Sequence, residues 1–327
     1  MPVVTGEAVF LGSCSGTFYA FNRRSGQTLW TYNIKQDGNQ SSFHGSMIVF
    51  DKRVYVGTDR GTDPAAEGHI YAFDSATGKA AWKYAASTGV STDLLRDDSR
   101  LIAYCANGEL VSFDLQSGKP AWKKKITEPN SDQYLSSPVL LGHVVYAATA
   151  TSAVVAVRTT DGEMLWRRQL EAGYLQNVVL GNELYVLSGA KYLYRLDKVT
   201  GDVRAKNDLQ AVPYFVPSPA ADSILVEFSD HTLKHISKGD PVWSVKFESD
   251  LTTHKPLVLQ HQVIVADATG KLSAWRLEDG APLWSTVFQH LKAPITTVGS
   301  DAEMLYVGTQ DGTLFGVDRH KLERRQE

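Results

Sequence analysis

Polar and aromatic side chains that can contact a ligand or transfer a proton recur in short segments between apolar runs. They are His44, Asp93, Tyr134, Tyr174, Gln176, Tyr214, His254, Lys255 and Lys292. Carboxylate and imidazole groups serve as general bases, lysine and glutamine hold polar groups, and tyrosine rings wall pockets. These nine residues form the candidate set for binding a ligand or a partner. The plain alternative is a solvated rim of mixed polar loops, and the sequence favours it for the set as a whole.

The motifs that usually accompany catalysis do not occur in this sequence. There is no nucleophile elbow, no phosphate-binding glycine loop that enters a helix, and no paired-cysteine spacing. A buried Asp93 could act as a general base, but a carboxylate that is solvated or caps a loop is the favoured interpretation. We therefore expect no catalytic residue, no metal and no cofactor.

Composition limits the class of protein further. The 327 residues are 43% hydrophobic and 21% charged, with a net charge of -3. These values are typical of a soluble, well-cored protein and give no basic field for a nucleic acid. Two cysteines, Cys14 and Cys105, exclude a disulfide-rich scaffold, and burial as small hydrophobic residues is favoured over redox work.

No apolar run reaches the roughly 18 residues that span a bilayer. The first ten residues, "MPVVTGEAVF", lack the regions of a signal peptide. We expect either a cytosolic chain or a mature form whose leader has been removed.

An eightfold repeat organises the chain and must position the candidate residues. The apolar stretch that we predict as the third strand of each unit begins at Gly16, Gly68, Gly108, Ser152, Lys191, His231, Gly270 and Gly312. Successive starts are separated by 52, 40, 44, 39, 40, 39 and 42 residues. Repeats of this length indicate stacked supersecondary units.

Each unit contains four short apolar runs broken by Gly, Asp and Ser, as in "SSPVLL", "HVVYAAT", "AVVAVRT" and "EMLWRRQ" from Ser136 onward. Such runs predict a four-stranded antiparallel sheet. Because one sheet cannot bury both faces alone, the sequence predicts an all-β, eight-bladed β-propeller. We expect a single domain over residues 1–327. Its blades span approximately 1–38, 39–88, 89–130, 131–172, 173–211, 212–249, 250–290 and 291–327.

A glycine followed four residues later by a tryptophan, as in "SGQTLW", recurs between the third and fourth strands. The tryptophans in these positions are Trp30, Trp82, Trp122, Trp166, Trp243 and Trp284. An Asp that accepts N–H groups and a Gly at positive φ suit a tight hairpin with a bulge. The Trp then falls on the outer strand, where its ring can cover the seam between blades and its N–H can find an acceptor.

Two units depart from this pattern, and we expect the ring to be loosest there. The fifth has Ala205 in place of Trp, and the eighth, "DRHKLERRQE", lacks both Gly and Trp. The first residues already resemble the first two strands of blade one. The eighth blade is therefore expected to have a frayed or missing outer strand. Either "KLERRQ" forms its last strand, or an N-terminal strand was removed with a leader.

The candidate residues share one predicted face of the propeller. Segments that join one blade's outer strand to the next blade's inner strand lie on the same face as the hairpins between second and third strands. All nine candidates fall in such joining segments, around the axial channel. An insertion in blade two, Asp59 to Gly68, should project over this face.

The repeated Gly and Trp positions resemble the pyrroloquinoline quinone (PQQ) repeat family, whose tryptophan-docking motif is A/G-x-x-x-W. That family includes eight-bladed PQQ-dependent alcohol dehydrogenases and the BamB-like propellers of outer-membrane assembly, which lack the cofactor. The dehydrogenase type implies adjacent cysteines, a calcium site of Glu, Asn and Asp, and a catalytic Asp. Cys14 and Cys105 are not adjacent.

The resemblance therefore favours a noncatalytic binding or scaffolding propeller of the BamB-like type. We expect a protein or peptide partner, possible work in envelope or outer-membrane protein assembly, a periplasmic location, a monomer, and no nucleic-acid partner. The alternatives are a quinoprotein-type oxidoreductase with PQQ and calcium, or a small-ligand-binding sensor domain.

Overall fold

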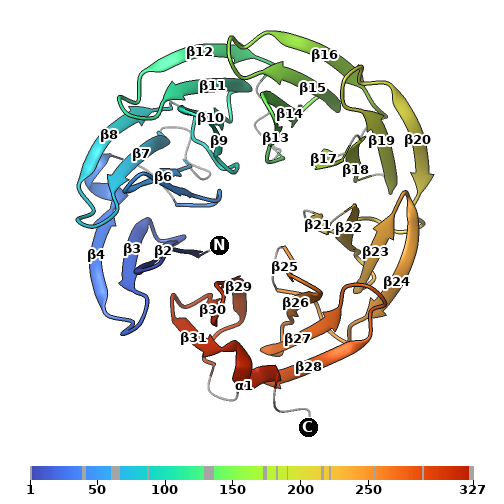
Figure 1. Ribbon diagram of the computed structural model, residues 1–327. Coiled ribbons are helices and arrows are strands. Elements are labelled where there is room, and N and C mark those ends of the chain that lie inside the picture. The colour runs from blue at the N-terminus through green and yellow to red at the C-terminus, as the bar shows by residue number, and fades with distance from the viewer. Residues whose placement is uncertain are drawn as a thin grey trace. The chain divides into compact units, whose positions relative to one another are not determined.

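The computed structural model describes residues 2–38, 42–59, 67–86, 88–128, 136–171, 175–181, 183–189, 191–214, 217–220, 222–252, 255–288 and 291–323. These residues form eight antiparallel sheets in chain order, seven with four strands and one with three (Figure 1). Within these ranges, helix is limited to a short 3-10 segment at Ile34–Asp37 and to α1, Arg319–Glu323. The predicted fold class, an all-β eight-bladed β-propeller, is confirmed.

The first four sheets contain the strands β1 to β16. The first consists of β1 (Val3–Val4), β2 (Ala8–Gly12), β3 (Thr17–Asn22) and β4 (Thr28–Asn33). The second consists of β5 (Ile48–Phe50), β6 (Arg53–Gly57), β7 (His69–Asp74) and β8 (Ala80–Ala85). The third consists of β9 (Leu95–Asp97), β10 (Arg100–Tyr104), β11 (Glu109–Asp114) and β12 (Pro120–Lys125). The fourth consists of β13 (Val139–Leu141), β14 (Val144–Ala148), β15 (Ala153–Arg158) and β16 (Met164–Gln169).

The last four sheets contain the strands β17 to β31. The fifth consists of β17 (Leu175–Leu180), β18 (Glu183–Ser188), β19 (Tyr192–Asp197) and β20 (Val203–Asp208). The sixth consists of β21 (Ser218–Ala220), β22 (Ser223–Glu227), β23 (Thr232–Ser237) and β24 (Asp240–Lys246). The seventh consists of β25 (Leu257–Leu259), β26 (Gln262–Ala266), β27 (Lys271–Arg276) and β28 (Pro282–Val287). The eighth has β29 (Ile295–Ser300), β30 (Met304–Thr309) and β31 (Leu314–Asp318).

The chain divides into two compact units. One contains residues 3–177 and 197–202, and the other contains residues 1–2, 178–196 and 203–327. The prediction of a single domain stays a prediction. No helix within the described ranges has the length and hydrophobicity that crossing a membrane requires.

The hydrophobic core is shared between successive blades. Phe10 and Phe18 of blade one pack in one cluster with Val54 and Phe73 of blade two. Comparable clusters join blades two and three, three and four, five and six, six and seven, and seven and eight. A blade is too thin to enclose its own apolar side chains, so the contact with its neighbour supplies the buried volume.

The hairpin between third and fourth strands has the structure that its sequence predicts. In blade two, Asp74 Oδ1 accepts hydrogen bonds from the backbone N–H and the hydroxyl of Thr77, at 2.9 and 2.8 Å. These bonds to the charged form hold the pKa of Asp74 below its usual value. The ladder then shifts by a bulge between Ala72 and Phe73, and the same shift follows in each of the seven four-stranded blades.

The tryptophans of the outer strands lie against the hairpin of the following blade. Trp82 Nε1 donates to the carbonyl oxygen of Leu115 at 3.0 Å, and its ring covers Gly118. The bonds of the same kind are Trp30 to Ser75 at 3.0 Å, Trp122 to Thr159 at 2.7 Å, Trp166 to Lys198 at 3.0 Å and Trp243 to Leu277 at 2.8 Å. One side chain therefore supplies both an apolar cover and a directional bond at each of these seams.

At two seams the packing differs from this pattern. In blade five, where Ala205 replaces Trp, Asn207 lies against Gly239 of the next blade. In blade seven, Trp284 Nε1 donates within its own blade, to Gln262 Oε1 at 3.2 Å.

One of the two expected closures of blade eight, with "KLERRQ" as its outer strand, is wrong for the described residues of that segment. Residues 319–323 form α1, and the helix packs along β28 instead of pairing with β31. Leu322 is buried in the cluster that contains Trp284, so the helix covers the tryptophan that has no following hairpin. The missing outer strand expected for this blade is confirmed among the described residues.

We predict that Gly118→Ala lowers the free energy of unfolding more than Gly26→Ala. Both glycines have positive φ, +68° and +69°, so an alanine costs about 1–2 kcal/mol at either site from backbone strain. A Cβ at Gly118 would also lie 2.4 Å from the Trp82 ring, whereas Gly26 faces open space. The seam contact should add about 1–3 kcal/mol at Gly118 alone. Urea denaturation of both variants measures the difference, and equal losses would refute the role of the indole contact.

Candidate functional site

The predicted candidate residues that the structure describes lie at one end of the strands. In an antiparallel four-stranded sheet, the hairpin between second and third strands and the segments that join successive sheets share one end. The hairpins between first and second and between third and fourth strands share the other end. We refer to the first as the joining end and to the second as the hairpin end, for each unit separately.

His44 forms a polar cluster with Asp59 and Ser42 at the joining end of blade two. His44 Nδ1 is paired with Asp59 Oδ2, and the Ser42 hydroxyl donates to Asp59 Oδ1 at 3.0 Å. Asp59 is buried, while about two fifths of the His44 side chain, 42%, is exposed. The hydrogen bond to Asp59 raises the pKa of His44, with partial burial opposing it.

These residue types are those of a hydrolytic triad, but their geometry is different. In a triad the serine faces one ring nitrogen of histidine and the carboxylate faces the other. Here the Ser42 hydroxyl lies 3.4 Å from Nδ1, the same nitrogen that pairs with Asp59. The hydroxyl donates to the carboxylate, so the imidazole is not placed between the two as it is in a triad. The cluster therefore fixes the segment from Ser42 to His44 against Asp59.

Asp93 connects the joining segments of three successive blades. Its Oδ1 accepts the backbone N–H of Ser46 at 2.7 Å, and its own N–H donates to Ser137 Oγ at 3.0 Å. Beside it, Gly45 approaches Thr92 so closely that a Cβ would lie 2.0 Å from the Thr92 carbonyl oxygen. Asp93 therefore caps loops, which is the arrangement that the sequence favoured over a general base.

Tyr214 is exposed, and its backbone is hydrogen-bonded to that of a buried acid, Glu227. Its side chain is 52% exposed, and its N–H donates to the carbonyl oxygen of Glu227 at 2.8 Å. The Glu227 side chain is buried, and its Oε2 has no hydrogen-bond partner among the described residues. Burial, with the nearby charge of Asp250, raises the pKa of Glu227 to about 8, although a bond from the backbone of Leu251 opposes the shift.

The structure describes some of the remaining candidates and not others. Lys255 is half-buried and Lys292 is exposed. Gln176 lies on β17, but its side chain falls outside the described residues. Tyr134, Tyr174 and His254 also lie outside them. The structure brings His44 and Asp93 into hydrogen-bonded loop contacts. Their role in binding stays a prediction.

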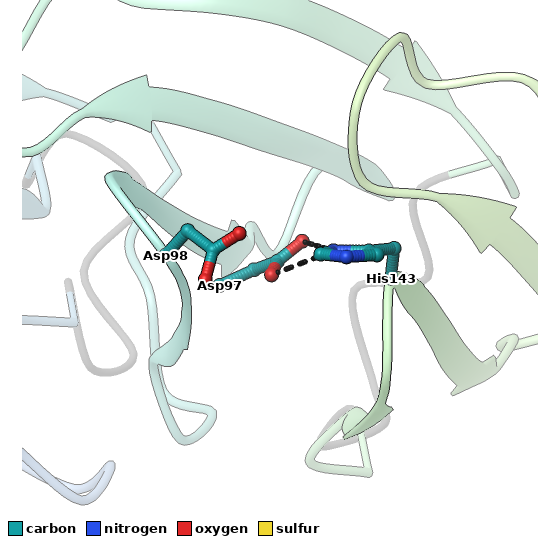
Figure 2. Close-up of side chains that lie close together, drawn as sticks. All are labelled: Asp97, Asp98 and His143. Atoms are coloured by element: carbon teal, nitrogen blue, oxygen red, sulfur yellow. Dashed lines mark hydrogen bonds and ion pairs between the residues drawn. The ribbon is translucent and has the colours of Figure 1, made fainter.

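A second polar cluster lies at the hairpin end of blades three and four, where sequence reasoning did not search. His143 Nδ1 faces both carboxylate oxygens of Asp97, at 3.0 and 3.1 Å (Figure 2). The Thr159 hydroxyl donates to the same carboxylate, and the Thr159 backbone accepts the Trp122 indole N–H. The hydrogen bond to Asp97 raises the pKa of His143, whose ring is exposed. The cluster clamps the seam that Trp122 covers.

Asp98 completes a group that has the ligand types of a metal site. One ligand atom each of Asp97, Asp98 and His143 lie within 4.8 Å of one another, and Figure 2 shows Asp98 beside the pair. Carboxylate and imidazole are ordinary ligands of Zn²⁺. However, the Asp97 carboxylate already accepts bonds from His143 and Thr159, so the group is satisfied as a structural clamp.

A shallow pocket also lies between blades two and three at the hairpin end. Its volume is about 230 Å³, and Phe50, Arg53, Tyr55 and Asp114 are among the residues that line it. Binding sites for small molecules usually occupy about 300–1,000 Å³. The Arg53 guanidinium donates to the carbonyl oxygen of Gln116 at 2.9 Å, so this charged group links blade two to blade three.

The Asp97 cluster could have been found by comparing equivalent hairpins of consecutive repeats. Asp97 and His143 occupy the first hairpin of consecutive blades, and Thr159 follows the third strand of the second of these blades. Equivalent hairpins of successive blades lie side by side, so pairs of acidic and basic residues at these positions can be sought across repeats.

Comparison with known proteins agrees with the repeat architecture. The family model described as "Outer membrane protein assembly factor BamB" matches residues 1–207 and 214–325. The outer membrane protein assembly factor BamB of Salmonella typhimurium is 25% identical over 341 residues, which cover 97% of this chain and 84% of that protein.

Two solved structures have a similar fold. BamB from Moraxella catarrhalis has a TM-score of 0.77 and 18% identity, over 97% of this chain and 96% of that one. The quinohemoprotein alcohol dehydrogenase ADHIIG of Pseudomonas putida HK5 has a TM-score of 0.67 and 13% identity, over 94% of this chain and 68% of that one. At these identities the likeness concerns the fold alone.

The buried acid Glu227 predicts a pH-dependent stability. Its pKa rises from 4.5 in the unfolded chain to about 8 in the folded one, so folding takes up a proton between these pH values. The stabilisation is complete below about pH 4.5 and is lost as the pH rises through about 8. The quantity to compare is the unfolding free energy of Glu227→Gln minus that of the wild type. We expect this difference to be about 1–3 kcal/mol larger at pH 9 than at pH 5.

Chemical denaturation at both pH values measures this change. Glu128→Gln removes an exposed carboxylate, 84% accessible, and serves as the matched control. An equal pH dependence in the wild type and in Glu227→Gln would contradict the assignment.

Proposed function

Because the chain belongs to the family of the outer membrane protein assembly factor BamB, we propose that it is a noncatalytic scaffolding propeller. It binds protein segments during the assembly of outer-membrane proteins. The match of the family model to residues 1–207 and 214–325 is the observation that carries this proposal. We further propose that the protein works outside the cytoplasm, in the cell envelope.

The use of the polar side chains supports a scaffold over an enzyme. His44 pairs with Asp59, Asp93 caps loops, and His143 clamps Asp97. These three groups hold one blade or loop to another. A catalytic site instead needs a nucleophile, a base and an oxyanion donor that converge on one point.

The joining end supplies a surface that fits protein binding. His44 and Asp93 make its loops rigid, since both fix backbone segments through charge-assisted hydrogen bonds. In the other unit Tyr214 is exposed on a joining segment, and the half-buried Lys255 lies on the next joining segment along the chain. Rigid loops that present tyrosine lose little entropy on binding, and tyrosine is enriched where interfaces bind most strongly.

Complementation tests the proposal. The chain, exported by a fused signal peptide, is expressed in Escherichia coli that lacks its own BamB, a relative 25% identical to this chain. We expect the levels of outer-membrane barrel proteins to rise above those of the empty vector, and Tyr214→Ala to lower this rescue severalfold. Immunoblots of outer-membrane fractions measure both.

Val199→Ala is the matched control, because Val199 is 74% exposed in a turn between third and fourth strands. Its rescue should equal that of the unaltered chain. Absence of rescue by a folded, exported chain would count against the assembly function. Full rescue by Tyr214→Ala would instead remove Tyr214 from the binding surface.

We propose that the protein works without PQQ or calcium. Cys14 is exposed and Cys105 is buried, and both are free thiols in separate blades. They do not form the pair of adjacent cysteines that the resemblance associates with the quinoprotein dehydrogenases. We expect no saturable change in PQQ absorbance on adding the protein with calcium, and no dye reduction with alcohols. Stoichiometric PQQ binding with dye reduction would support the oxidoreductase instead.

A further inference from the structure

Glu227 is an exception to the repeat. Near the end of the second strand, each blade places one residue opposite an apolar residue of the third strand, as Glu227 lies opposite Leu233 in blade six. The residues at this position in blades one, two, three, four, seven and eight are Gly12, Gly57, Tyr104, Ala148, Ala266 and Gly308. Five of these six are glycine or alanine, and burial raises the pKa of Tyr104 so that it keeps its proton. Within this set of blades, only blade six has a group here that can become charged near neutral pH.

The side chain at this position points toward the joining segment of the next blade. A Cβ on Gly12 would lie 2.6 Å from Cβ of Phe43, which belongs to the joining segment between blades one and two. In blade six the corresponding contact is polar, because the backbone N–H of Leu251 donates to the carboxyl group of Glu227. Leu251 belongs to the joining segment between β24 and β25. Where the compared blades pack hydrogen, methyl or a phenol, this seam contains a carboxyl group.

Glu227 links the two joining segments on either side of blade six. Its backbone carbonyl oxygen accepts the N–H of Tyr214, on the segment that enters the blade, at 2.8 Å. Its carboxyl group accepts the N–H of Leu251, on the segment that leaves it. The buried side chain of Leu251 packs in one cluster with Leu225 and Leu233 of blade six. We refer to residues 249–252 as the latch segment.

The carboxyl group is poorly satisfied in this position. Glu227 is only 3% exposed, and its Oε2 has no hydrogen-bond partner among the described residues. In the latch segment, Ser249 Oγ is also buried without a partner in the described chain. A buried carboxylate with so few donors costs far more free energy than a buried neutral acid. Outward movement of the latch segment would give both groups access to water.

The charge of a neighbouring acid acts in the same direction. Among the described residues, Asp250 of the latch segment supplies the charge that acts on Glu227. Asp250 is 64% exposed, and its Oδ1 pairs with Nδ1 of His231, on the hairpin between β22 and β23, at 2.9 Å. A second negative charge at Glu227 would repel Asp250 and favour its movement away from the blade.

We propose that Glu227 is a positioning residue whose proton holds the latch segment against blade six and whose ionisation releases it, an inference that rests on the proposed scaffold function. The latched joining end binds the protein partner more tightly, because rigid loops lose less entropy on binding. Since the pKa of Glu227 rises from 4.5 to about 8 on burial, the latch is most stable below about pH 4.5 and weakens as the pH rises to about 8.

Hydrogen exchange of the full chain, followed by NMR at pH 5.5 and pH 8.5, tests the latch. Rates are compared as protection factors, which remove the direct effect of pH on exchange. We expect the protection factor of the Leu251 amide to be at least about tenfold lower at pH 8.5. The Gln310 amide, which donates to the carbonyl oxygen of Pro294 at 3.0 Å in blade eight, is the reference for global unfolding. Its protection factor should fall at least about threefold less.

Variants assign the response to one carboxyl group. Glu227→Gln keeps the shape of the side chain without ionising, and Glu227→Ala introduces the residue that blades four and seven have at this position. In both variants the Leu251 protection factor should differ by less than about twofold between the two pH values. His231→Gln is the matched control, because it removes the titratable partner of Asp250 and should retain the full response. Circular dichroism at both pH values establishes that the variants fold.

The complementation assay connects the latch to binding. Escherichia coli that lacks BamB and expresses the exported chain is grown at pH 5.5 and at pH 8.0. Levels of outer-membrane barrel proteins are compared with those that the bacterium's own BamB supports at the same pH. We expect the rescue by the unaltered chain to be at least about twofold weaker at pH 8.0, and the rescue by Glu227→Gln to be equal at both pH values.

Four results would overturn the proposal. These are a Leu251 protection factor that does not change with pH, an equal fall for Leu251 and Gln310, an equal response of the wild type and Glu227→Gln, and a response that His231→Gln abolishes. Rescue by the wild type that is equal at both pH values would refute the coupling of the latch to binding. The expected exchange behaviour without rescue at either pH would support the latch and refute the scaffold function, so the two proposals fail separately.

Discussion

The docking of an indole ring on the hairpin of the next blade is the interaction on which this structure depends. Trp82 contributes an apolar cover for Gly118 and a hydrogen bond to Leu115 in a single side chain. The first requires a glycine, because any Cβ would meet the ring, and the second requires an exposed carbonyl oxygen in the turn. The Asp-capped, bulged hairpin supplies both, so the motif links turn, strand register and seam.

The seam explains which parts of the fold were predictable from sequence. Gly, Asp and Trp act locally and recur with the repeat, so the blades, their third strands and the bulged turns could be derived from spacing alone. The exceptions depend on contacts that spacing does not contain. Asn207 replaces the indole at one seam by packing on Gly239, and α1 covers Trp284 where no hairpin follows. Neither Asn207 nor α1 belongs to a repeated pattern.

The candidate site was less predictable, for a physical reason. The repeat predicts that the nine candidates fall in joining segments, but it does not assign their partners. The sequence allows Asp93 to be a general base or a loop cap, and only the hydrogen bond from Ser46 distinguishes these two roles. The Asp97, His143 and Thr159 clamp joins residues up to 62 positions apart, so no local motif records it. Polar partnership depends on loop conformation, which side-chain periodicity does not encode.

The sharing of each core between neighbouring blades has a consequence for synthesis. Phe10 and Phe18 emerge from the ribosome before Val54 and Phe73, which complete their cluster. A nascent blade therefore carries half-covered apolar surface until the following repeat, roughly 40 residues later, has been made. Translation pauses or chaperone contacts between repeats would act on this interval, and the growing chain gains protection one seam at a time.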